Sequence, residues 1–145
     1  MPEKETLERA RKDKREGKSP STQAGEFVRE EIEHVREGKH GARSAKQAIA
    51  IGLSKARRAG VELSPPKTGS KRIREQAARD EKKGKSANKK TSAKRSRASL
   101  RALKDEGQSA ASTIALSRHA HAVARKRSAA ARSQSAKKAA RTRKK

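Results

Sequence analysis

Four histidines are the side chains in this sequence best suited to proton transfer or metal binding. They form two pairs far apart in the chain, His34 with His40 and His119 with His121. No cysteine accompanies them, and His119 and His121 would point to different faces of a helix because they are two residues apart. We therefore expect no metal site, no cofactor and no catalytic residue, so the chain is not expected to be an enzyme.

Other residue types give no sign of catalysis or of small-molecule binding. The glycines near Gly38 and Gly52 follow no predicted strand, so they do not fit a phosphate-binding loop or a dinucleotide fingerprint. Carboxylates form no cluster suited to the metal ions of a nuclease. The chain has one Phe and no Trp or Tyr, which argues against proteins that stack unpaired bases on aromatic rings. Recognition of a duplex or of its backbone is favoured.

The charge of the chain points to a polyanionic partner. Lysine and arginine number 41 against 16 acidic residues, for a formal net charge of +25. Residues 1–63 hold 15 basic and 11 acidic side chains, whereas residues 64–145 hold 26 and 5. Such a charge repels itself unless phosphates neutralise it, so nucleic acid is the expected partner.

Composition limits the size of the folded part. Only 30% of the residues are hydrophobic, and low hydrophobicity with high net charge is typical of disordered segments. The expected fold is all-α, a small helical hairpin followed by a largely disordered or nascent-helical basic C-terminal half. No apolar run reaches the roughly 18 residues that span a bilayer, so we expect a cytoplasmic protein located in the nucleoid, without membrane contact.

Two segments have clear helical patterns that should place the first basic residues. Residues 22–37 have apolar side chains at helical spacing, and the opposite face is acidic, with Glu26, Glu30, Glu33 and Glu37 turned away from the core. This face would repel phosphate, so the first helix serves as scaffold. The second helix is predicted from the Ser44–Gln47 capping box to Gly60. Small residues on its apolar stripe favour a close hairpin with the first helix.

Basic residues around the second helix and in the tail are the predicted nucleic-acid contacts. Arg43 and Lys46 come first, because a helix N-terminus presents unpaired N–H groups to an anion. Ile51 points away from the apolar stripe, which leaves self-association or docking of another segment open. The full predicted set is Lys39, Arg43, Lys46, Arg57, Arg58, Arg125, Lys126, Arg127, Arg132, Lys137, Lys138, Arg141, Arg143, Lys144 and Lys145.

The predicted organisation has five parts. A charged N-terminal arm (1–20) precedes the hairpin head (21–63), and a Pro/Gly linker (64–70) separates the head from the basic half. Weakly amphipathic basic helices (71–125) and a disordered Lys/Arg/Ala tail (126–145) complete the chain.

Residues 19–61 resemble a family of small basic bacterial proteins of uncharacterised function, often with Lys/Ala-rich tails. The most distinctive stretch is GKHGARSAKQAIAIGLSKARRAG, residues 38–60. The resemblance implies a bacterial cytosol and brings no activity, ligand or catalytic residue. Separately, the tail from Lys126 is similar in composition to those of linker histones and histone-like bacterial proteins.

Together these observations predict a sequence-independent, histone-like DNA-binding protein of the nucleoid that acts by neutralising phosphates. The same charge pattern would serve an RNA-binding or ribosome-associated protein. A disordered stress-related protectant or protein-interaction factor is an alternative of another class. Neither a membrane nor a small-molecule substrate is an expected partner.

Overall fold

A computed structural model describes residues 1–86 and 92–144, and these stretches are all-α. No strand occurs in either of them. The all-α class predicted from the sequence is therefore confirmed. The elements are α1 (Lys4–Arg15), α2 (Pro20–Arg36), α3 (Ala45–Arg58), α4 (Lys71–Lys85), α5 (Ala93–Lys104), the 3-10 turn η1 (Ser109–Ala111), α6 (Thr113–Arg125) and α7 (Ala129–Arg143).

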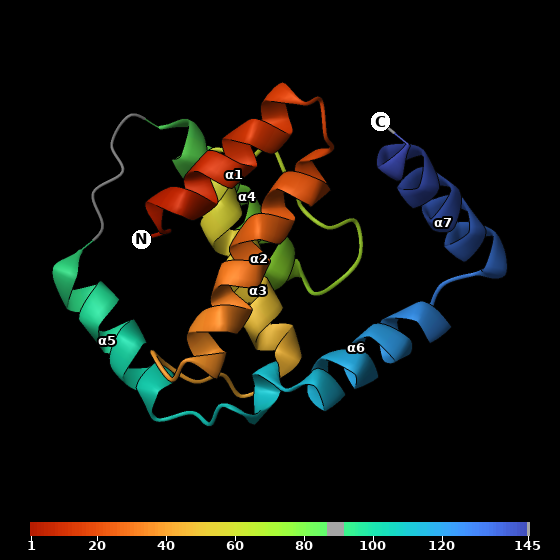
Figure 1. Cartoon of the computed structure of the whole chain (residues 1–145). Helices are drawn as coiled ribbons and strands as arrows, with labels where there is room; N and C mark the ends of the chain where they lie inside the picture. Colours follow the sequence, from red (N-terminus) through yellow and green to blue (C-terminus); the bar gives the residue numbers. More distant parts are fainter. Residues whose placement is uncertain (87–91, 145) are drawn as a thin grey trace.

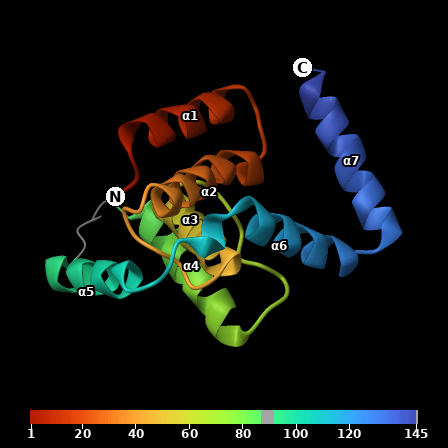
Figure 2. The same cartoon turned by 60° about the horizontal axis from the view of Figure 1, so that its bottom comes forward.

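The first four helices form a stack in chain order. Each packs against the next, α1 on α2, α2 on α3 and α3 on α4 (Figures 1 and 2). The 3-10 turn η1 and the start of α6 close the end of this stack, whereas α7 lies to one side of it in both views. No described helix is long and apolar enough to cross a membrane.

The hairpin of α2 and α3 follows the sequence pattern closely. Ser44 is the N-cap of α3 and its hydroxyl accepts a hydrogen bond from the Gln47 N–H, as predicted. The Gln47 side chain accepts from the Arg43 N–H and not from the Ser44 N–H that a full capping box would use. Gly60 ends the helix with φ of +96°, and the Val61 N–H returns to the Ala56 carbonyl. Helix α2 begins earlier than expected, because Ser19 is its cap and Pro20 occupies the first turn, where no N–H is needed.

Close approach of α2 and α3 depends on Gly52. A Cβ atom built on this residue would lie 2.6 Å from the Val28 Cα and 3.0 Å from the Phe27 carbonyl oxygen. Both neighbours are backbone, which cannot rotate away as a side chain can. The backbone of α3 is therefore in direct contact with that of α2, and Phe27 is buried beside it with Ala24 and Ala56.

The acidic face of α2 is only partly open to solvent, because α1 covers part of it, whereas the sequence suggested that the whole face is open. Glu30 is 2% exposed, and its carboxylate accepts a hydrogen bond from the Glu3 N–H. Arg9 in α1 lies 2.6 Å from Glu26 Oε2. Hydrogen bonds from His34 and Lys39 lower the pKa of Glu3 below its ordinary value. The charges of α1 thus pair with glutamates that would otherwise repel one another.

The expectation of a disordered or nascent-helical C-terminal half is wrong. The described residues after position 70 include four α-helices, and each begins with a serine cap. The hydroxyl of the cap accepts a hydrogen bond from the backbone N–H three residues later, for Ser70, Ser92, Ser112 and Ser128. Alanine, lysine and arginine then supply helix propensity. The sequence-based prediction gave these caps less weight than the shortage of large apolar side chains, which is typical of disordered segments.

Small residues also let parts of this half dock on the hairpin. Ala110 and Ala111 of η1 are buried in one core cluster with Ile32 and Val35 of α2. A Cβ on Gly84 in α4 would lie 2.0 Å from the Arg57 carbonyl oxygen, so that glycine lies against the end of α3. The core therefore needs few large side chains, because backbone approaches backbone at alanine and glycine.

Substitution of Gly52 by alanine tests the hairpin contact. We expect the free energy of unfolding to fall by about 1–3 kcal/mol, because the added methyl forces the helices apart. Gly25→Ala in α2 is the matched control, since a Cβ there meets nothing within 4 Å. That change should raise the stability by up to about 1 kcal/mol through helix propensity. Urea unfolding of both variants checks this, and equal effects would contradict the close contact.

Candidate nucleic-acid interface

An open, cationic cleft lies between the start of α3 and the start of α6. Its volume is about 320 Å³. The basic side chains Arg43, Lys46 and Arg118 line it together with His119. The Ala45 and Lys46 N–H groups belong to the first turn of α3, where a helix has no carbonyl partner for them. Cations and backbone donors therefore converge on one surface, an arrangement that suits phosphate.

The cleft includes the two residues that the sequence placed first. Lys46 is exposed and forms no ion pair in the described part of the chain. The Arg43 side chain is 80% exposed and lies 3.3 Å from Glu106 Oε1. An exposed pair of this kind contributes little stability, so Arg43 can exchange Glu106 for a phosphate at small cost.

Other predicted contacts on the head are engaged by the protein itself. Lys39 pairs with Glu37 and Glu3, which raises its pKa. Arg57 is 8% exposed and donates to the Leu63 carbonyl, and burial lowers its pKa. Arg58 lies at the α3–α4 contact, where its Nε donates to Asp80 Oδ1 at 2.7 Å. Lys39, Arg57 and Arg58 are therefore less available to a phosphate than Arg43 and Lys46 are.

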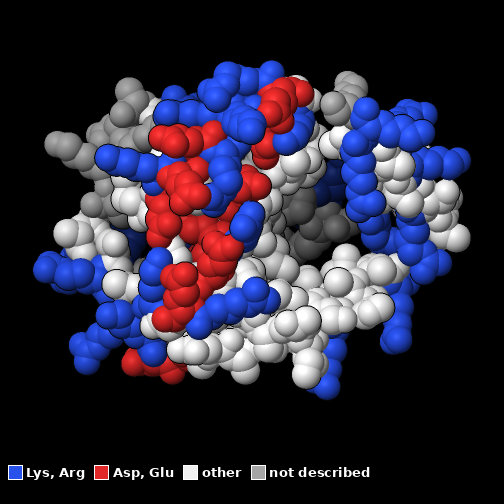
Figure 3. All heavy atoms as spheres, viewed as in Figure 1, with Lys and Arg blue, Asp and Glu red and all other residues white. Residues whose placement is uncertain are grey.

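The predicted tail residues come together on the end of α6 and on α7. Arg125, Lys126 and Arg127 lie where α6 meets α7, and Arg127 donates to Ala131 and Ser135. On the face shown in Figure 3, lysine and arginine dominate the α7 side, at the right, while acidic side chains gather over α1 and α2. The other predicted residues on α7 or at its end are Arg132, Lys137, Lys138, Arg141, Arg143 and Lys144, all exposed, and Lys145 lies outside the described residues.

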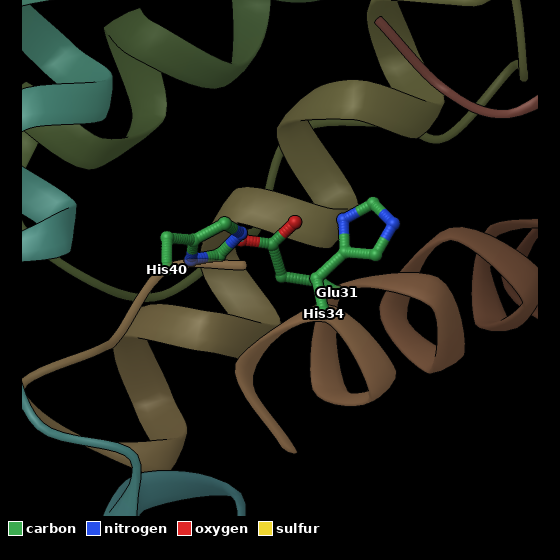
Figure 4. Close-up of side chains that lie close together, drawn as sticks. All are labelled: Glu31, His34 and His40. Atoms are coloured by element: carbon green, nitrogen blue, oxygen red, sulfur yellow. The ribbon is translucent and has the colours of Figure 1, made fainter. Parts of the chain in front are cut away.

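The histidines are distributed differently from the expectation. His119 lies in the cationic cleft, and His121 of the same helix is exposed. His34 and His40 come together with Glu31, and one possible ligand atom from each of the three lies within 4.8 Å of the others (Figure 4). The first pair of histidines therefore has a carboxylate partner that sequence reasoning missed.

Sequence reasoning also missed Arg118, Glu106 and Asp80. Asp80 is 2% exposed and receives hydrogen bonds from Ser54 and Arg58. Nothing in the local pattern of α4 marks it as buried, because the partners belong to another helix. One signal was available for Glu106. A Cβ on Gly41 would lie 1.8 Å from the carbonyl oxygen of Glu106. A glycine in a loop can indicate that another part of the backbone approaches closely.

Comparison with known proteins places the first part of the chain in context. Residues 11–68 match a family of unknown function (DUF6496). The match includes Arg43, Lys46 and the whole α2–α3 hairpin, and it ends before α4. Among curated proteins and among solved structures, none matches the chain.

The role of Asp80 as an anchor for α4 can be measured. Asp80→Ala should lower the free energy of unfolding by about 1–3 kcal/mol, because it leaves Ser54 and Arg58 without their acceptor. Glu75→Ala, an exposed position of the same helix, should change it by less than about 0.5 kcal/mol. Chemical denaturation of both variants provides the comparison. Equal losses would show that Asp80 does not hold α4 on α3.

Proposed function

We propose that this protein binds duplex DNA through its phosphates, independently of base sequence, as a nucleoid-associated protein. One observation supports this most strongly, the absence of acidic partners for the basic residues of α6 and α7. Among the described residues 107–144, none forms an ion pair, and no Asp or Glu occurs after Glu106. When unpaired basic residues neutralise the phosphates of a duplex, the cations condensed on the duplex are released, and that release drives the binding.

The composition of helix α7 suits a surface that binds a polyanion and does not suit a helix that packs into a core. It has no buried residue, and arginine and lysine occur around it among alanine and serine. Its 15 residues extend over about 22 Å, at 1.5 Å per residue. A helix of this length can follow several successive phosphates along a duplex.

The cleft between α3 and α6 supplies a second cationic surface, on the α2–α3 hairpin. Helix α6 packs against α3 and η1 at its N-terminal end, so Arg118 is held near Lys46. Contacts from both the cleft and helix α7 would fix the orientation of the duplex relative to α3. On the face shown in Figure 3, the acidic side chains over α1 and α2 lie apart from the basic side chains of α7.

Two features bear on the alternatives. Phe27 is 1% exposed, so the one aromatic ring of the chain is not available for stacking on unpaired bases. The helices after residue 70 weigh against a disordered protectant, whereas a protein-interaction factor stays open as an alternative. An RNA duplex presents phosphates as well. Competition between duplex DNA and structured RNA for the protein shows which of the two it prefers.

A salt series with unrelated duplexes of equal length tests the proposal. We expect similar affinities for all sequences and a steep decrease as salt rises. The double variant Lys46→Glu with Arg118→Glu should bind more weakly, and its slope of log affinity against log salt should be shallower by about two. Fluorescence anisotropy measures both quantities.

The control variant is Arg11→Glu with Lys12→Glu, which changes the net charge equally on exposed positions of α1. It should keep nearly the full slope. Equal losses in the two variants would show that affinity follows net charge and not the cleft. Weak, salt-insensitive binding of the unaltered protein would refute the proposal.

A further inference from the structure

We infer that Glu31, His34 and His40 form a binding site for a first-row divalent metal ion of the zinc class. Glu31 and His34 are one turn apart on α2, and His40 returns to them from the loop that follows. Their candidate ligand atoms lie within 4.8 Å of one another. Metal–ligand bonds of about 2.0–2.2 Å place ligands about 3.4 Å apart, so small side-chain rotations would close the site.

The hydrogen bonds of both histidines leave the correct nitrogen free. His40 Nδ1 lies 3.1 Å from the Gly41 carbonyl oxygen, which only accepts, so Nδ1 carries the proton and Nε2 faces Glu31. His34 Nε2 lies 2.9 Å from Glu3 Oε1, which leaves Nδ1 for the cluster. Metal-binding histidines usually donate the other ring N–H to a carbonyl or carboxylate in this way. Figure 4 shows the Glu31 carboxylate between the two rings.

Glu31 provides an independent sign that a cation belongs here. It is fully buried, and neither carboxylate oxygen has a partner in hydrogen-bond geometry. His40 Nε2 lies 3.3 Å from Oε1, and Lys55 Nζ lies 2.6 Å from Oε2 without that geometry. The Glu31 Oε1 and the His40 Nε2 both offer lone pairs, so they attract each other only when a proton or a metal ion lies between them. A metal ion would satisfy both groups at once.

The charges around the three residues suit a metal ion, and a surface cleft reaches one of them, His34. Lys55 Nζ also lies 3.5 Å from Glu30 Oε1, so the ammonium can stay paired when Glu31 turns to a metal. A cleft of about 140 Å³ reaches His34 and is lined by several carboxylates, which attract cations, including Glu3, Glu33 and Glu37. Two imidazoles and one carboxylate are the donors of open zinc sites, in which water completes the coordination.

Titration of the metal-free full-length protein with Co²⁺ tests this inference. Co²⁺ takes the place of zinc and gives visible absorption bands whose intensity reports four or five ligands including nitrogen. We expect one ion per chain, intense bands, and their loss when Zn²⁺ is added. The midpoint of thermal unfolding should rise with Zn²⁺ concentration. Absence of a stoichiometric Co²⁺ complex would overturn the inference.

Three histidine variants locate the site. His40→Gln and His34→Gln should each lose the intense bands and weaken Co²⁺ binding by more than about tenfold. Tenfold is the low end of the loss seen when a residue that only supports a metal ligand is replaced. His119→Gln is the matched control and should bind like the unaltered protein. Equal binding by all three variants would show adventitious metal binding and refute the site. Because His34 lies near the surface, its variant tests the site even if His40→Gln does not fold.

Discussion

Unequal distribution of the acidic side chains along the chain is the constraint on which the rest of the structure depends. All 16 acidic residues lie between residues 1 and 106. Many of them are used within the helical stack, where Glu30, Glu31 and Asp80 are buried beside basic side chains. The stack therefore balances much of its own charge. The basic residues of α6 and α7 all follow Glu106 in the sequence, and among the described residues they form no ion pair.

A second constraint follows from the shortage of large apolar side chains. The helices pack at glycine and alanine, as Gly52 does against α2 and Gly84 against the end of α3. Ala110 and Ala111 seal the other end of the core. Such contacts bury little area per residue but bring backbones close, so van der Waals contact and hydrogen bonds such as Arg36 to the Ala111 carbonyl stabilise the fold.

The sequence predicts the elements that have strong local signals. Helices α2 and α3 could be recognised from Phe27, Ile32, the Ser44 cap and Gly60. The C-terminal helices over 71–125 were expected to be only nascent and the tail to be disordered, because the prediction weighed apolar content over serine caps. The covering of α2 by α1 could not be seen, since alternating charges on a short helix do not identify their partner.

The candidate sites were predictable to different degrees. Arg43 and Lys46 could be named because they flank the start of a helix, whereas Arg118 joins them only through the path of the chain around η1. Glu31 and His34 have the spacing of neighbours on one helix face, which was a usable signal. Their meeting with His40 depends on the turn at Gly38, where φ is +72°.

The most direct test of this unequal distribution is hydrogen–deuterium exchange of the full chain with and without a DNA duplex. The account predicts that the duplex slows exchange in α6, in α7 and in the first turn of α3, and leaves the amides of α1 and α2 unchanged. Slower exchange confined to α1 and α2, or no change anywhere at low salt, would contradict it.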